Sequence, residues 1–155
     1  MATEIERKFL VRDQRWKIGA SGKAFRQGYL ATEHAGTVRV RLVGEQAWLT
    51  IKGRTEGYSR LEFEYEIPLA DGREILDRLC PGPTIDKTRY RIEHAGHVWE
   101  VDAFHGANEG LVVAEIELTS EDESFARPEW LGEEVSGDPR YFNSNLVRAP
   151  FLTWK

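Results

Sequence analysis

The chain has little cysteine and no long apolar run, and each shortage excludes a class of protein. Its 155 residues include one cysteine, Cys80, so no intramolecular disulfide can form and a reducing compartment is expected. No apolar stretch approaches the length that crosses a bilayer. We expect no signal peptide, because the N-terminus leads directly into a strand. A cytoplasmic protein without a membrane partner is the expectation.

The chain also lacks a net positive charge and the short motifs of several enzyme classes. Its formal net charge is −5, whereas a general nucleic-acid binder has a basic surface, so we expect no nucleic-acid partner. The segment 19–23, Gly-Ala-Ser-Gly-Lys, is too short for a P-loop and lacks the final Ser or Thr. Zinc-ligand spacing is missing among the histidines, which are His34, His94, His97 and His105.

Alternation of charged and apolar residues is what the chain has in abundance, and it predicts a mainly β (α+β) fold. The length suits one domain with a sizeable core. The predicted strands cover residues 3–11, 24–30, 37–43, 46–52, 58–68, 85–94, 97–104 and 111–118. Eight strands are enough to close an antiparallel β-barrel.

Three short helices are predicted beside the strands. Residues 71–80 have a helical apolar pattern with Asp71 as N-cap and Pro81-Gly82 as the stop. Further helices are expected near 128–133 and at about 139–148, where the last helix could close one end of the barrel. In this arrangement the charges point inward, and the apolar residues pack outward under helices: Ile5, Val40, Phe63, Tyr65, Tyr90, Val101 and Ile116.

Charges of one sign share one face of several strands. Glu4, Glu6 and Lys8 stand at every second position of the first strand and therefore lie on one face. The later rows are basic at Arg39, Arg41, Lys52, Lys87, Arg89 and Arg91, and acidic at Glu62, Glu64, Glu66, Glu100, Asp102, Glu115 and Glu117. Adjacent like charges are destabilising unless something neutralises them.

Separate acidic and basic rows suit a metal-complexed polyphosphate. Carboxylates bind hard cations such as Mg²⁺ or Mn²⁺, and Arg and Lys bind phosphate oxygens. Spacing alone leaves a second interpretation equally open, in which the polar face is merely solvated and carries weak salt bridges.

The order of these charges resembles the CYTH domain of the triphosphate tunnel metalloenzymes. The similarity runs from Glu4-x-Glu6-x-Lys8 through the later charge pairs to the segment 135–143, so it covers nearly the whole chain. It implies one CYTH domain over residues 1–155, built as an eight-stranded antiparallel tunnel that binds triphosphate and a divalent metal. Members of the family include inorganic tripolyphosphatases, thiamine triphosphatases and class IV adenylate cyclases.

The resemblance also implies roles for individual residues. The triphosphate-binding residues would be Lys8, Arg39, Arg41, Lys52, Lys87 and Arg89. The metal-binding candidates would be Glu4, Glu6, Glu62, Glu64, Asp102, Glu115 and Glu117, with Glu64 alternatively orienting a basic neighbour. Lys87, Glu4 and Glu6 are the catalytic candidates, because a Lys crowded by other cations can have a lowered pKa and activate water.

The sequence constrains the identity of the substrate less than it constrains the residues of the site. The chain leaves little material for an organic group, so hydrolysis of inorganic tripolyphosphate to pyrophosphate and phosphate ranks first. Nucleoside or thiamine triphosphate hydrolysis ranks second and adenylate cyclisation third. Two non-enzymatic functions also remain possible interpretations, a non-catalytic polyphosphate-binding module and a structural β-domain.

One exposed patch among Trp16, Trp48, Trp99, Trp130 and Trp154 could mediate a homodimer.

Overall fold

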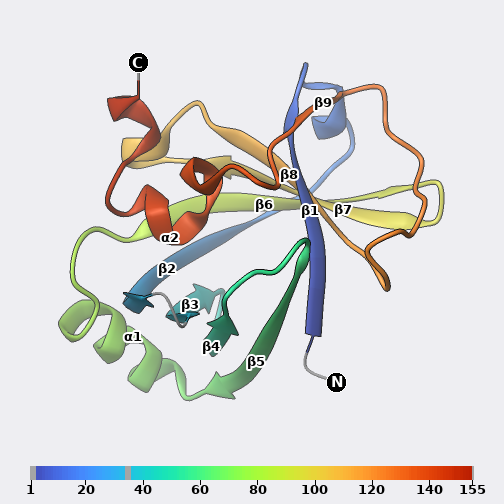
Figure 1. Ribbon diagram of the computed structural model, residues 1–155. Helices are drawn as coiled ribbons and strands as arrows, with labels where there is room; N and C mark the ends of the chain where they lie inside the picture. The colour runs from blue at the N-terminus through green and yellow to red at the C-terminus, as the bar shows by residue number, and fades with distance from the viewer. Residues whose placement is uncertain (1–2, 34–35, 155) are drawn as a thin grey trace.

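The alternating segments form a closed eight-stranded antiparallel β-barrel with one extra strand and a few short helices (Figure 1). This computed structural model describes residues 3–33 and 36–154. The strands are β1 (Thr3–Val11), β2 (Gly22–Glu33), β3 (Gly36–Val43), β4 (Gln46–Gly53), β5 (Ser59–Ile67), β6 (Ile85–His94), β7 (His97–Phe104), β8 (Val112–Glu117) and β9 (Leu131–Glu134). Their order is β5-β4-β3-β2-β6-β7-β8-β1, and pairing of β1 with β5 closes the barrel. The predicted fold class is confirmed.

The strand registers place charged residues from different strands opposite one another inside the barrel. Lys8 of β1 pairs with Glu115 of β8, and Arg89 of β6 pairs with Asp102 of β7. Directly opposite residues of an antiparallel pair lie on the same face. The barrel interior is therefore charged, and the apolar alternates point outward.

The outward apolar residues are covered by several different segments. Trp99, Val101 and Ile116 are completely buried, and they form one cluster with residues of the segment after β8, which arches over this side in Figure 1. Helix α1 (Leu69–Arg78) covers β2, β3 and β4. The expectation that helices cover all outward residues is wrong for Phe63 and Tyr65, which are 41% and 56% exposed.

One helix and one strand differ from the sequence prediction. Helix α1 begins at Leu69 with Pro68 in the N-cap position, so Asp71 lies in the first turn, where its charge favours the helix dipole. The sequence predicts a helix at 128–133, but residues 131–133 belong to strand β9 (Leu131–Glu134) instead. The physical reason is that β1 pairs with β5 only over residues 3–5, and β9 pairs with the later part of β1.

The C-terminal helix is shorter than the predicted 139–148. The predicted range contains a 3₁₀ turn (Pro139–Tyr141) and the helix α2 (Asn143–Leu146). A final 3₁₀ turn follows at Phe151–Thr153. Two further 3₁₀ turns span Arg15–Lys17 and Gly106–Asn108. In the described part of the chain, no helix combines the length and apolar character needed to span a bilayer.

The tryptophans do not form the exposed patch that the sequence suggested. Trp16, Trp99 and Trp130 are buried in one cluster, and Trp48 and Trp154 are half-buried. Large aromatic side chains bury more apolar area than any others, so their burial in the core is especially favourable. A homodimer remains a prediction without this support.

The turn between β6 and β7 is strained at one residue, and this generates a stability prediction. Ala95 has φ 51° and is the one non-glycine residue with positive φ in the described ranges, while Gly96 follows at φ 83°. Such hairpin turns favour Asn-Gly, and a left-handed conformation costs alanine about 1 kcal/mol. We expect Ala95→Asn to raise the melting temperature by about 2–4 °C. Thermal denaturation should show no such gain for Ala149→Asn, a control at an exposed position with ordinary φ; equal shifts would contradict the assignment.

Candidate functional site

The inward-facing charges line a single cavity of about 250 Å³ inside the barrel. All the predicted triphosphate-binding residues and all the predicted metal-binding residues except Asp102 line it. The basic lining residues are Lys8, Arg39, Arg41, Lys52, Arg60, Lys87 and Arg89, and the acidic ones are Glu4, Glu6, Glu62, Glu64, Glu100, Glu115 and Glu117. Tyr29 and Phe142 are the aromatic residues among them.

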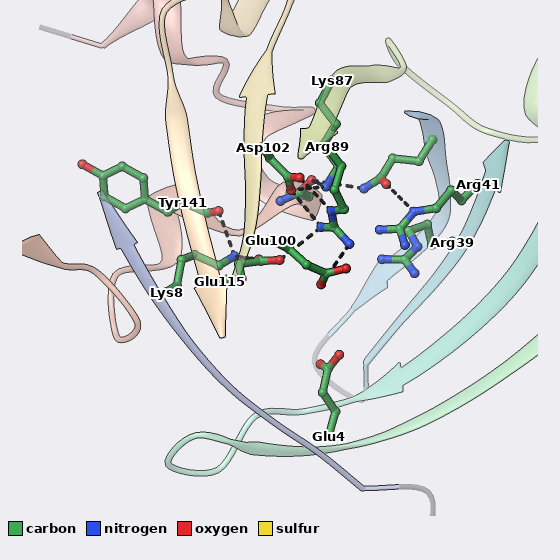
Figure 2. Close-up of polar contacts among 12 residues, drawn as sticks. Glu4, Lys8, Arg39, Arg41, Lys87, Arg89, Glu100, Asp102, Glu115 and Tyr141 are labelled. Atoms are coloured by element: carbon green, nitrogen blue, oxygen red, sulfur yellow. Dashed lines mark hydrogen bonds and ion pairs between the residues drawn. The ribbon is translucent and has the colours of Figure 1, made fainter. Parts of the chain in front are cut away.

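A tight ion cluster of β6, β7 and β8 forms one wall of the cavity. Asp102, 1% exposed, forms an ion pair with Lys87 Nζ at 2.8 Å and accepts hydrogen bonds from Arg89 Nε and Nη2 at 2.7 and 2.8 Å. Arg89 also donates to Glu115 at 3.1 Å and lies 3.4 Å from Glu100. Figure 2 shows these side chains converging, with Arg39 and Arg41 approaching from β3. Asp102 thus fixes the direction of two cations that face the cavity.

Lys87 has an unusual protonation equilibrium in this cluster. Burial lowers its pKa to about 7, and Arg89 and Arg41 act in the same direction, although the Asp102 carboxylate opposes them. For Asp102 itself, burial acts to raise the pKa, but Arg89 and Lys87 outweigh it and the pKa is lowered. An ammonium with a pKa near neutrality can give up or accept a proton under physiological conditions.

Most of the other lining cations have a carboxylate partner. Lys8 Nζ lies 3.2 Å from Glu115 and donates to the Tyr141 carbonyl at 3.3 Å. Lys52 bridges two acids on neighbouring strands, with Glu4 at 3.0 Å and Glu62 at 3.3 Å.

Arg39 is also paired, but only in part. Its Nη2 donates to Thr50 at 3.0 Å and to Glu64 at 3.4 Å, so Glu64 orients a basic neighbour. Its Nε is buried without a hydrogen-bond partner in the described ranges.

Arg41, which is half-buried, is the least neutralised of the predicted triphosphate-binding residues. Its Nε donates to the Gln27 side chain at 2.9 Å, and no carboxylate of the described residues forms an ion pair with it. Burial lowers its pKa to about 9, with Arg39 and Arg89 adding to the effect. The guanidinium carbons of Arg41 and Arg89 lie 4.9 and 5.0 Å from the centroid of the Phe25 ring. A half-buried guanidinium without a counter-ion is a favourable position for an anion.

Two carboxylates on the opposite side are equally without partners. Glu6 of β1 and Glu117 of β8 are directly opposite in register, and no hydrogen bond or ion pair within residues 3–33 and 36–154 involves either carboxylate. Burial, together with Glu115 and Glu4, raises the pKa of Glu6 to about 8. For Glu117, partial burial and then Glu4 raise the pKa as well. Facing like charges of this kind favour a bound cation.

The donor set suits Mg²⁺ or Mn²⁺, although the carboxylates do not form a ready-made cage. In the part of the chain that the structure describes, no three acidic or histidine side chains converge as a metal site. Mg²⁺ characteristically uses one or two carboxylates and takes its other ligands from water and substrate phosphates. The unpaired oxygens of Glu6 and Glu117 fit that requirement.

Sequence reasoning missed several residues that the structure brings to the site. Arg60 shares the parity of Glu62 and Glu64, so the alternation along β5 could have identified it. No spacing signal indicates Asn143, because the C-terminal segment reaches the cavity only through tertiary folding. Of the other acidic residues in the predicted rows, Glu100 pairs with Arg89, whereas Glu66 is exposed and accepts a hydrogen bond from Gln46.

Comparison with known proteins identifies the family. The model of the CYTH domain matches residues 2–148. An inorganic triphosphatase of Acetivibrio thermocellus is 50% identical over 155 residues, which is 100% of this chain and 99% of that protein. An inorganic triphosphatase of Nitrosomonas europaea is 38% identical over 150 residues, covering 94% and 97% respectively. A crystal structure of an inorganic triphosphatase aligns with a TM-score of 0.64 at 34% identity, covering 92% of this chain and 96% of that chain. With matches that span nearly its whole length, the chain belongs to the CYTH domain family.

Proposed function

We propose that this protein is a divalent-metal-dependent triphosphatase that hydrolyses inorganic tripolyphosphate to pyrophosphate and phosphate. The observation that carries the proposal is the coexistence of unneutralised charges of both signs in one cavity. Arg41 lacks an anion, and Glu6 and Glu117 lack a cation. A metal-complexed polyphosphate supplies both. The relatives named as inorganic triphosphatases support the same activity.

The charge balance of the cavity explains why a metal is needed. The basic and acidic lining residues are equal in number, so the fully ionised lining is formally neutral. Such a lining cannot compensate a triphosphate, which carries several negative charges. Divalent cations that enter with the substrate would supply the missing positive charge. Mg²⁺ and Mn²⁺ are both compatible with the oxygen donors.

The size and composition of the cavity favour an inorganic substrate. At about 250 Å³ it is smaller than the 300 Å³ or more that is usual for organic ligands. Phe142 contributes one of the few aromatic rings, and its face already lies 5.6 Å from Lys8 Nζ. Residues 142–144 line the cavity, so we propose that the C-terminal segment closes this end. A base or thiazole ring would have little surface on which to stack.

The lining residues, together with Asp102, divide into three tasks under this proposal. Lys8, Arg39, Arg41, Lys52 and Arg89 bind phosphate oxygens. Glu6 and Glu117, assisted by Glu4, bind the metal, which when bound stabilises charge on the phosphates and acidifies water. Asp102, Glu115 and Glu64 primarily orient the cations with which they form ion pairs.

Under this proposal Lys87 activates the attacking water. In its neutral form it accepts a proton from water as the oxygen attacks the terminal phosphorus. The bond from that phosphorus to the bridging oxygen breaks, and pyrophosphate leaves with the bonding electrons. The pKa of about 7 makes the neutral form accessible near physiological pH.

Phosphate release from tripolyphosphate, ATP and thiamine triphosphate tests the proposed function. With Mg²⁺ or Mn²⁺ we expect fastest release from tripolyphosphate and none with chelator. Glu6→Gln should lower the rate by about 100-fold or more, because it removes an unpaired carboxylate from the metal site. Glu45→Gln, in the exposed turn after β3, is the matched control. Conversion of ATP to cyclic AMP, or tripolyphosphate binding without turnover, would contradict the proposal.

The role of Lys87 is tested by separating kcat from KM. We expect Lys87→Ala to lower kcat by about 100-fold or more, the range of general-base effects, while KM changes little because five other cations bind the phosphates. Arg41→Met is the comparison, and its main effect should be a higher KM. Steady-state kinetics that show equal losses in kcat and affinity for Lys87→Ala would exclude water activation.

The raised pKa of Glu6 predicts how the metal-free protein responds to pH. Between its ordinary value of 4.5 and about 8, the folded protein retains a proton that the unfolded chain releases. The free energy of unfolding therefore falls as pH rises across this window. In chelator, Glu6→Gln should lose less stability than wild type between pH 5 and pH 8. Since about 1 kcal/mol corresponds to about 2–4 °C at this size, melting temperatures should resolve the difference. Parallel pH curves for the two proteins would show that Glu6 titrates normally.

A further inference from the structure

A continuous hydrogen-bonded bridge connects two of the proposed functional cations through uncharged side chains. Gln27 of β2 is completely buried, and its Oε1 accepts from Arg41 Nε at 2.9 Å. Its Nε2 donates to Asn143 Oδ1 at 3.2 Å. Asn143 Oδ1 also accepts from Lys87 Nζ at 2.9 Å. This Gln27–Asn143 bridge thus joins β3, β2, α2 and β6.

The direction of every hydrogen bond in the bridge is determined by its two ends. A guanidinium and an ammonium can only donate, so both amides must turn an oxygen toward a cation. Gln27 then has its NH₂ group available for Asn143 and for the Tyr29 hydroxyl, 3.1 Å away. Reversing either amide would place two donors together. The bridge therefore has one arrangement in which all its members are satisfied.

The bridge limits the orientation of the Lys87 ammonium. One of its N–H groups donates to Asn143 at 2.9 Å, and the Asp102 carboxylate forms an ion pair with the ammonium at 2.8 Å. Lys87 lines the cavity, so the ammonium can also face a group bound there. With Asp102 as its only partner, the ammonium could rotate about that single contact.

A completely buried glutamine has an obvious packing cost. Burying an amide is unfavourable unless its hydrogen bonds are made, and an apolar residue would fill the same space more favourably. Gln27 makes its bonds exclusively toward members of the site, namely Arg41, Tyr29 and Asn143. The hydrogen bonds that offset the cost of burying the Gln27 amide are thus made to residues that line the cavity.

We propose that Gln27 and Asn143 are positioning residues, which hold Arg41 in a phosphate-binding orientation and Lys87 in a water-activating orientation. This inference rests on the proposed function for its catalytic readout. Neither residue acts on the substrate chemically. Asn143 orients Lys87, and Gln27 orients Arg41 and fixes the Asn143 amide.

Kinetics of near-isosteric variants test the bridge. We expect Asn143→Leu to lower kcat by about 10-fold with KM within about 2-fold, because Lys87 loses its second partner. Gln27→Met should lower kcat similarly and raise KM several-fold, because Arg41 also loses a partner. The double variant should be about as slow as Gln27→Met alone, since both changes interrupt one chain.

Asn145→Leu is the matched structural control. Asn145 lies in the same helix, where its side chain bonds the Pro139 carbonyl at 2.8 Å and Arg148 at 3.0 Å rather than Lys87. We expect it to lower the melting temperature without changing kcat. A loss of kcat in Asn145→Leu equal to that in Asn143→Leu, or multiplied losses in the double variant, would overturn the proposal.

Binding of tripolyphosphate separates failure of the bridge from failure of the proposed function. If wild type binds tripolyphosphate with Mg²⁺ but releases no phosphate, the triphosphatase proposal fails, and calorimetry still tests the bridge. Gln27→Met should then weaken tripolyphosphate binding several-fold relative to Asn145→Leu. Equal affinities in these two variants would show that Gln27 does not position Arg41.

Discussion

The rest of the structure depends on the pairing of charges inside a closed barrel. Asp102 is 1% exposed and forms ion pairs with Lys87 and Arg89, so its removal would leave the buried Lys87 ammonium without a carboxylate partner among the described residues. The apolar outer wall can form only if these charges turn inward together. The charged lining of the cavity and the apolar core outside the barrel therefore both result from the same alternation of residues along the strands. The ion pairs that orient the cations of the site also offset the cost of burying charges inside the barrel.

The exceptions to this pairing give the site its binding capacity. Arg41 lacks a carboxylate partner, and Glu6 faces Glu117 across a strand pair. Uncompensated charges of this kind destabilise the folded state. A ligand that compensates them removes this destabilisation, and the gain contributes to the binding free energy. The barrel keeps such residues in place because its eight strands share one continuous hydrogen-bonded sheet, closed between β1 and β5. For these charged side chains to move out into solvent, the pairing between β1 and β5 would have to break.

The strands, their charged faces and the barrel were predictable because the two-residue period is a local property of the sequence. The same parity places Arg60 beside Glu62. What could not be predicted depends on partners distant in the chain. Strand β9 forms because part of β1 continues past its pairing with β5, which local propensity near 128–133 cannot reveal. Asn143 meets Lys87 across 56 positions of sequence, and the choice of ion-pair partners follows from registers that spacing does not encode.

The acidic residues, which the sequence treats as equivalent metal candidates, separate into two groups by environment. Lys8 and Arg89 lower the pKa of Glu115 despite its burial, and Arg89 and Lys87 do the same for Asp102. A cation bound to either would have to displace ion pairs already formed at 2.7–3.2 Å. Glu6 and Glu117 have raised pKa values, and a divalent ion there would replace a proton or relieve repulsion without breaking an ion pair. The difference in displacement cost therefore favours metal at Glu6 and Glu117, and it leaves Asp102 and Glu115 to orient the cations beside them.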